Sequence, residues 1–241
     1  MELISFQIKG RFAHFLRAES SVNALSYPVP PRTVIIGILG AVLGLPKDKP
    51  QILLEPANIA ISGKLPKTHW HRVKLRKDPP TSLPHIIKKT QKPTKNKAPE
   101  KAALILQEWL FEPDYTIWSS IPEPYQTELK NRFKTKEWHF TPFLGLSEMM
   151  ADISYHDTNE CVHLPKGTYD IKSAFQQKAV ALEMDQIFER ELVIHSLHMP
   201  RTLTSDRVFS HSAYFLERDG RAIPVTTEKA YKVNDKIVMF L

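Results

Sequence analysis

The chain has 241 residues, 42% of them hydrophobic, which is enough for one large domain or for one domain with a sizeable extension. The single cysteine, Cys161, excludes a disulfide framework and a cysteine-based zinc site, and the longest apolar run, residues 34–45, is too short to span a bilayer. The net charge of +7 indicates an acidic partner, and because no signal peptide is evident we expect a soluble, cytoplasmic protein with no membrane partner.

The first part of the chain predicts a strand, a helix and a second strand. Apolar and polar side chains alternate over residues 3–9, which is typical of a strand. After a connecting segment, two prolines precede an apolar run at residues 32–45, and this pattern predicts a helix. Residues 56–63, with two isoleucines two positions apart, predict the next strand.

Two residues at the start of the predicted helix are candidates for ligand binding. Arg32 lies at the positive end of the helix dipole, where it gains nothing from the dipole, and the free N–H groups beside it favour an anion such as phosphate. Tyr27, between a serine and a proline, is placed to stack or hydrogen-bond near that anion. The alternatives are a surface arginine on a plain buried helix and a core aromatic.

The predicted helix also contains three of the eight glycines of the chain. Each interior glycine costs about 0.5–1 kcal/mol relative to alanine. We therefore expect a neighbouring strand, or alternatively a ligand, to approach the helix closely at Gly37, Gly40 and Gly44.

One segment, residues 64–101, carries a net charge of +10, more than the whole chain, and its prolines exclude a long helix. Residues 64–76 read as a basic strand with an aromatic side chain, and residues 88–101 are typical of a mobile loop. The segment is either a solvated lysine loop or an electrostatic arm for nucleic acid, with cations for phosphates and aromatics for bases. Its candidate RNA-binding residues are Lys64, Lys67, His69, Trp70, Arg72, Lys74, Arg76, Lys77, Lys88 and Lys89.

A metal site is a minor alternative for the same segment. His69 and His71 would share one face of a strand, as two metal ligands can. No third ligand follows at a definite spacing, so we expect neither a metal nor a cofactor.

The rest of the chain completes an alternating pattern. Residues 104–119 are apolar and aromatic and contain a strand near residues 115–118. Residues 122–133 predict a second helix, opened by two prolines, with acidic residues early and basic residues late. Residues 149–155 predict a fourth strand, and several short apolar runs follow.

This order predicts an α+β protein with a ferredoxin-like βαββαβ domain, the arrangement also used by RNA-recognition folds. We expect that domain at residues 1–155, with a basic β-hairpin thumb inserted at about residues 64–118. Residues 156–241 are expected to form a β-rich C-terminal extension.

Short motifs along the chain resemble those of the fifth CRISPR-associated (Cas) family, which belongs to the repeat-associated mysterious protein (RAMP) superfamily. The resemblance is most specific in the first 45 residues and looser elsewhere. It rests on Phe6-x-Ile8-x-Gly10, Phe12-Ala13-x-Phe15, Ser26-Tyr27-Pro28, Pro31-Arg32-Thr33-x-x-x-Gly37 and Thr141-Pro142-Phe143-Leu144-Gly145, and more weakly on Met199-Pro200-Arg201 and Ile237-Val238-Met239-Phe240-Leu241.

The resemblance implies a non-catalytic subunit of a type I CRISPR surveillance complex (Cascade), most like the type I-B members. Such subunits bind the repeat-derived 5′ handle of the CRISPR RNA (crRNA) and cap the filament of backbone RAMP subunits. They contact the large subunit that reads the PAM, and they meet target DNA through the complex. Arg11 and Arg17, which follow the first strand, join the candidate RNA-binding residues.

The resemblance leaves an enzyme as the alternative. One branch of the family, in type I-C systems, cuts precursor RNA with the help of a tyrosine near the end of the first helix. In this chain the corresponding place falls near Leu43, and this departure from the family pattern argues against catalysis. Cleavage through a 2′-OH also needs a base and an acid, and His14 is the candidate for such a role. The alternatives are therefore a metal-independent endoribonuclease and a basic scaffold protein that only bridges other subunits.

Overall fold

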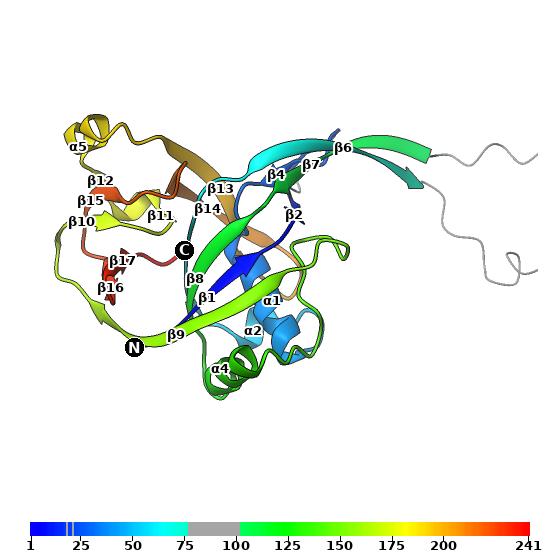
Figure 1. Ribbon diagram of the computed structural model, residues 1–241, viewed down its shortest axis with the longest axis horizontal. Coiled ribbons are helices and arrows are strands. Elements are labelled where there is room, and N and C mark those ends of the chain that lie inside the picture. Colours follow the sequence, from blue (N-terminus) through cyan, green and yellow to red (C-terminus); the bar gives the residue numbers. More distant parts are fainter. Residues whose placement is uncertain (18, 21, 77–101) are drawn as a thin grey trace, which may run out of the picture.

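The computed structural model describes residues 1–17, 19–20, 22–76 and 102–241. The expected loop at residues 88–101 lies outside the described residues, as do Lys77, Lys88 and Lys89. The described part is an α+β fold in which strands dominate, and its largest sheet is strongly curled (Figure 1).

The predicted strands and helices of the N-terminal part are present. The second helix begins three residues later than predicted, and the fourth strand continues well beyond residue 155. The elements are β1 (Glu2–Lys9), β2 (Phe12–Ala13), β3 (Phe15–Leu16), β4 (Ser26–Tyr27), α1 (Arg32–Leu43), α2 (Pro50–Leu53), β5 (Asn58–Gly63), β6 (Lys67–Arg76), β7 (Ala102–Phe111), β8 (Asp114–Ser120), α4 (Tyr125–Thr135) and β9 (Asp152–His163).

The C-terminal part is rich in strands and adds one short α-helix and one 3₁₀ turn that the sequence pattern did not predict. Its elements are β10 (Gly167–Ile171), β11 (Phe175–Gln176), a 3₁₀ turn at Gln177–Ala179, β12 (Ala181–Leu182), α5 (Met184–Glu189), β13 (Ile194–Leu203), β14 (Phe209–Glu217), β15 (Ile223–Thr227), β16 (Tyr231–Val233) and β17 (Lys236–Val238).

β1 lies inside the largest sheet, whose nine strands have the order β12-β15-β10-β17-β16-β9-β1-β8-β5. Alternation places Ile4, Phe6 and Ile8 in the main hydrophobic core together with residues of α1 and α4, and all three are fully buried. The ring of Phe6 lies 4.6 Å from that of Phe133 in α4. The alternating pattern of residues 3–9 therefore identified a core strand and the face that packs on the helices, while Leu3 and Ser5 on the opposite face are buried as well.

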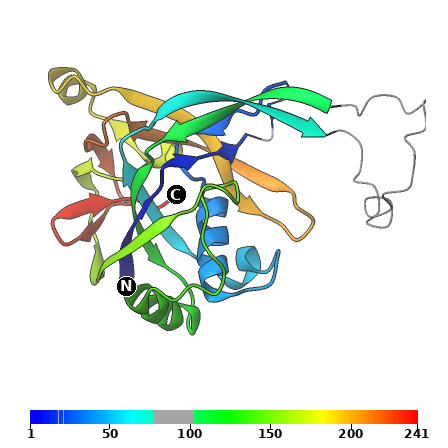
Figure 2. The same ribbon diagram turned by 45° about the vertical axis from the view of Figure 1, so that its right-hand side comes forward.

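The hairpin of β6 and β7 projects from this body (Figures 1 and 2). The two strands pair in register from Lys67 opposite Phe111 to Arg76 opposite Ala102. At its base, β2 pairs with the end of β7, and this pairing anchors the hairpin to the body. The hairpin lies between β5 and β8 in the sequence.

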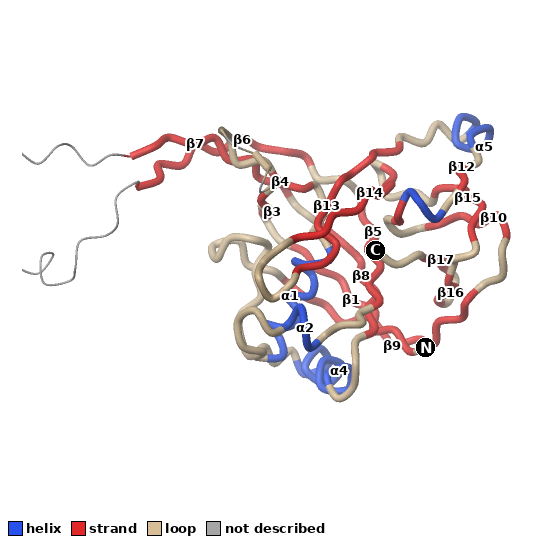
Figure 3. The backbone as a smooth tube through the Cα atoms, turned by 180° about the vertical axis from the view of Figure 1, so that it is seen from behind, coloured by secondary structure: helices blue, strands red, loops and turns tan. Residues whose placement is uncertain are grey.

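The C-terminal part continues the same sheet and adds a second sheet of order β11-β14-β13. β9 pairs with β1 and, near its end, with β16. The outer edge of β5 is covered, because the carbonyls of Ile59 and Ile61 accept hydrogen bonds of 2.8 Å from the amides of Leu241 and Ala174. Seen from behind, the C-terminal strands and the N-terminal sheet form one continuous body (Figure 3).

Two helix glycines have structural explanations, and neither involves the expected strand. A Cβ atom at Gly40 would clash with the ring of Pro50 in α2, so the close neighbour is a helix. Gly44 ends α1 with a φ of 76°, and its Cβ would lie 2.5 Å from the ring of His139. A Cβ atom at Gly37 would have no neighbour within 4 Å, so packing against the described residues does not explain this glycine.

Candidate nucleic-acid interface

Strand alternation gives the hairpin one basic, aromatic face. Trp70, Arg72 and Lys74 are exposed and lie two residues apart on β6. Leu106 and Leu104 lie opposite Arg72 and Lys74 on β7, and both are exposed. Cations can hold phosphates, while the indole and the leucines offer apolar surface to bases. We call this set, with Thr68, the basic hairpin face: Thr68, Trp70, Arg72, Lys74, Leu104 and Leu106.

The second face of the hairpin carries Lys67, His69 and His71. The ring of His71 lies 4.2 Å from the indole of Trp109, and Phe12 packs on the same indole at 5.3 Å. The residues predicted to act together are thus divided between two faces. Within the described residues, no group of three or more His, Cys, Asp or Glu side chains could hold a metal ion.

Two further candidate cations lie at the ends of the hairpin. The guanidinium of Arg11 lies over Phe12, 5.6 Å from the ring centroid, so Arg11 lies beside the second face. Arg76 is the last residue of β6 and pairs with Ala102.

A cavity of about 460 Å³ lies where the basic hairpin face meets the body of the protein. Thr68, Glu108 and Leu110 line it from the hairpin. Glu108 and Leu110 lie opposite Trp70 and Thr68, so their side chains continue the basic hairpin face. This volume is within the range of about 300–1,000 Å³ that is usual for ligand pockets. We call it the basal cavity. Its lining includes the polar residues Arg17, Ser26, Thr68, Glu108, His195 and Arg218.

Arg17 is held against one wall of the basal cavity. Its Nε donates a 3.1 Å hydrogen bond to the carbonyl of Ser26, and its guanidinium lies 5.2 Å from the ring centroid of Tyr27. Its terminal nitrogens make no hydrogen bond to a described residue. The backbone amide of Ser26 donates a 2.9 Å hydrogen bond to one carboxylate oxygen, Oε2, of Glu108. Arg17 is therefore positioned while its terminal donors stay available.

Tyr27 packs its ring against the guanidinium of Arg17. The residue is only 3% exposed, and its hydroxyl donates to the carboxylate of Glu19 at 3.2 Å. Burial, and secondly the charge of Glu19, raise the pKa of Tyr27 to about 12, so the phenol remains a neutral donor. The structure thus places Tyr27 in the core, which was the alternative to the predicted stacking role.

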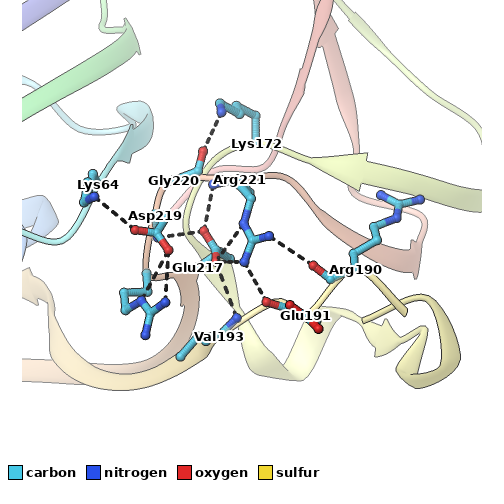
Figure 4. A network of polar contacts seen from close by, with 10 residues as sticks. Lys64, Lys172, Arg190, Glu191, Val193, Glu217, Asp219, Gly220 and Arg221 are labelled. Carbon is cyan, nitrogen blue, oxygen red and sulfur yellow. Dashed lines mark hydrogen bonds and ion pairs between the residues drawn. The ribbon is translucent and has the colours of Figure 1, made fainter. Parts of the chain in front are cut away.

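A buried carboxylate fixes the wall that carries Arg218. Glu217 is 1% exposed and accepts hydrogen bonds from the amides of Asp219 and Arg221 and from the Arg221 guanidinium (Figure 4). Asp219 pairs with Lys64 at 3.1 Å, and this hydrogen bond lowers the pKa of Asp219. The predicted candidate Lys64 therefore lies at the start of the hairpin, beside the cavity wall.

The predicted role of Arg32 as a phosphate ligand is corrected by the structure. The residue is buried, at 3% exposed, and its two terminal nitrogens donate to the two carboxylate oxygens of Glu55. Nη2 also donates to the carbonyl of Ala57 at 2.8 Å. Glu55, which follows α2 in the sequence, supplies the counter-charge, so the guanidinium of Arg32 pairs with a carboxylate of the protein itself and does not face a ligand.

His14 is a satisfied core histidine. It is 3% exposed, and its Nδ1 donates to the carbonyl of Glu108 at 2.7 Å. Burial lowers the pKa of His14, although the Glu108 contacts act in the opposite direction. A Cβ atom at Gly145 would clash with the carbonyl of His14, so the segment after α4 packs directly on it. The structure thus gives His14 no route to a substrate.

Sequence reasoning missed His195 and Arg218, which line the basal cavity from the C-terminal part of the chain. Neither residue stands in a motif. Both lie near the hairpin because β13 and β14 pack beside its base, and no local sequence pattern predicts that contact.

Among the described residues, no helix is long and apolar enough to cross a membrane.

Comparisons with known proteins show the family and support the fold. The sequence model of the family described as CRISPR-associated protein (Cas_Cas5) matches residues 3–215. Among solved structures, a CRISPR protein from Archaeoglobus fulgidus has a TM-score of 0.56 at 12% identity, with 100% of this chain and 99% of that chain covered. A chain of a CRISPR RNA-guided surveillance complex has a TM-score of 0.51 at 13% identity, with 91% of each chain covered. No curated protein sequence matches the chain.

Proposed function

The chain belongs to the CRISPR-associated Cas_Cas5 family, and on this basis we propose that it is the subunit of a type I surveillance complex that binds the 5′ handle of the crRNA and caps the backbone filament. In this role the protein captures RNA and does not cut it.

One observation carries the proposal: the basic hairpin face leads directly into the basal cavity. Exposed cations beside an exposed indole suit single-stranded RNA, whose phosphates need charge and whose bases need a flat surface. The arginines of the cavity, Arg17 and Arg218, extend this positive surface from the hairpin to the body.

The strand order supports the finer assignment of the fold. β9-β1-β8-β5, with α1 after β1 and α4 after β8, is the order expected of a ferredoxin-like βαββαβ domain. We propose this domain for residues 1–155, with the hairpin as its thumb, and a β-rich extension for residues 156–241.

We also propose the protein partners. Family membership supports a place among other Cascade subunits, which we take to be a backbone RAMP subunit and the large PAM-reading subunit of a type I-B system. Target DNA would be reached through the assembled complex. We assign no catalytic step, because the histidine considered for it, His14, is buried and bonded within the core.

Removing two cations from the basic hairpin face should weaken RNA binding and flatten its salt dependence. We expect the double variant Arg72→Ala and Lys74→Ala to reduce the slope of log K against log salt concentration by about 1.4, since each lost phosphate contact on a single strand contributes about 0.7. The measurement is a titration of labelled repeat RNA at several salt concentrations.

The matched control removes the same charge elsewhere. Lys47 and Lys49 are exposed in the loop between α1 and α2, and neither belongs to the hairpin or lines the basal cavity. The double variant Lys47→Ala and Lys49→Ala should keep the wild-type slope. Equal slopes for the two double variants would show that binding depends on net charge alone and would contradict the proposed interface.

A further inference from the structure

Resting on the proposed function, we propose that the basal cavity binds one unstacked nucleotide of the RNA. Arg17 and Arg218 hold its phosphate, and His195 and Glu108 face its base. The cavity favours a base with an exocyclic amino group over uracil.

The basic hairpin face offers an RNA strand a continuous path into the basal cavity. The basic hairpin face runs from Lys74 to Thr68, a distance of about 20 Å along a strand. Thr68 also lines the basal cavity, and Glu108 lies opposite Trp70 on the same face. An RNA strand that follows this face toward the body therefore enters the cavity without crossing the hairpin.

Two arginines, Arg17 and Arg218, line the basal cavity. Arg17 comes from the segment after β3 and Arg218 from the residue after β14, and the fold brings both to one cavity. Arg17 is oriented by Ser26 and Tyr27 and keeps its terminal donors available. The side chain of Arg218 is exposed, and among the described residues its guanidinium contacts only Asp219, through two long hydrogen bonds of 3.3 Å. A phosphate would give both groups stronger, charge-assisted hydrogen bonds.

The lining of the basal cavity has unused hydrogen-bonding capacity. The Nε2 atom of His195 is buried and has no hydrogen-bond partner among the described residues, a costly state that a base reaching this atom would relieve. Glu108 keeps one carboxylate oxygen outside its bond to Ser26. A carboxylate only accepts hydrogen bonds, so it fits the amino group of adenine, cytosine or guanine. It fits uracil less well, because the one N3–H donor of uracil lies between two carbonyl oxygens that repel a carboxylate. Bases that leave the stack are read by contacts of this kind.

The test is a scan of the RNA against variants of the full-length protein. The probe is fluorescein-labelled single-stranded RNA with the handle sequence of the protein's own repeat, in which each nucleotide in turn is made abasic. In the wild-type protein, one position should weaken binding by about 5- to 150-fold, the range typical of one bound base. In His195→Ala, the abasic change at that position should have little further effect, while other positions behave as in the wild type. Uracil at that position should weaken binding of the wild type.

Arg218→Ala provides a second test in case His195→Ala does not fold, because Arg218 is exposed. A methylphosphonate beside the identified nucleotide should weaken wild-type binding and have little effect on Arg218→Ala. The matched control is Arg207→Ala, which removes an exposed arginine that pairs with Asp48 away from the cavity. This control should respond to every RNA change as the wild type does.

The outcomes separate this inference from the proposed function. If the hairpin variants lose RNA affinity but no RNA position couples to His195 or Arg218, the nucleotide site is wrong and the RNA-binding function stands. If the hairpin variants bind RNA as the wild type does, the proposed function itself fails. If the cavity variants bind RNA normally but no longer assemble with partner subunits, the cavity is a protein-docking site and the inference is overturned.

Discussion

Glu55→Ala is expected to lower the free energy of unfolding by about 3–5 kcal/mol, the cost of leaving a buried charge without its partner. Arg32 is the charge that would be left. Its side chain is 4% exposed, against 35% for Glu55, so water can reach the carboxylate more easily than the guanidinium. Urea denaturation followed by circular dichroism measures the change.

Glu128→Ala is the matched control for this variant. It removes the same carboxylate from an exposed pair with Arg132, one helical turn away in α4. A surface pair of this kind contributes about 0.3–0.5 kcal/mol. If Glu55→Ala and Glu128→Ala cost the same, the Arg32–Glu55 pair does not stabilise the fold, and Arg32 again becomes a candidate ligand for RNA.

The same pair predicts a pH dependence. Burial raises the pKa of Glu55, but the hydrogen bonds and charge of Arg32 outweigh burial, and the net pKa lies below the ordinary value of 4.5. A carboxyl group with a lowered pKa in the folded state stabilises the protein above its unfolded pKa, and this contribution disappears as the pH falls through the folded pKa. Stability should therefore decline below about pH 5, and the decline should be shallower in Glu55→Gln.

Glu217→Ala is the second substitution with a large expected effect, about 3–4 kcal/mol of unfolding free energy. The buried carboxylate accepts hydrogen bonds from three backbone amides, those of Val193, Asp219 and Arg221, and alanine would leave these amides without a partner. A buried donor left unpaired costs about 1–3 kcal/mol, and because these three bonds are only part-buried we take the lower end of that range for each. The loss would appear as a lower urea midpoint.

Arg221→Ala distinguishes the capping of the backbone amides from the ion pair. The Arg221 side chain is 44% exposed, so water can replace much of its contact with Glu217, and we expect a cost of about 1 kcal/mol or less. A cost equal to that of Glu217→Ala would mean that the ion pair, and not the capping of backbone amides, holds the turn after β14. Because this turn carries Arg218, its loss should also weaken RNA binding at the basal cavity.

The sequence by itself determined the elements that depend on neighbouring residues. The alternation in residues 3–9 is enough to identify β1, because one face of a strand must be apolar when it packs on helices. The prolines and apolar run before residue 45 identify α1 in the same way. The charge of residues 64–101 located the basic hairpin, and the motifs around residues 6–37 identified the family.

Only the tertiary structure decided which charges face outward. Arg32 and Arg17 are both arginines near the N-terminal signature, yet one is neutralised by Glu55 inside the protein and the other keeps free donors in a cavity. The basal cavity gathers His195 and Arg218 with Arg17 from nearly the whole length of the chain. Burial and ion pairing depend on contacts between distant segments, and a local pattern of residues contains no information about where those segments meet.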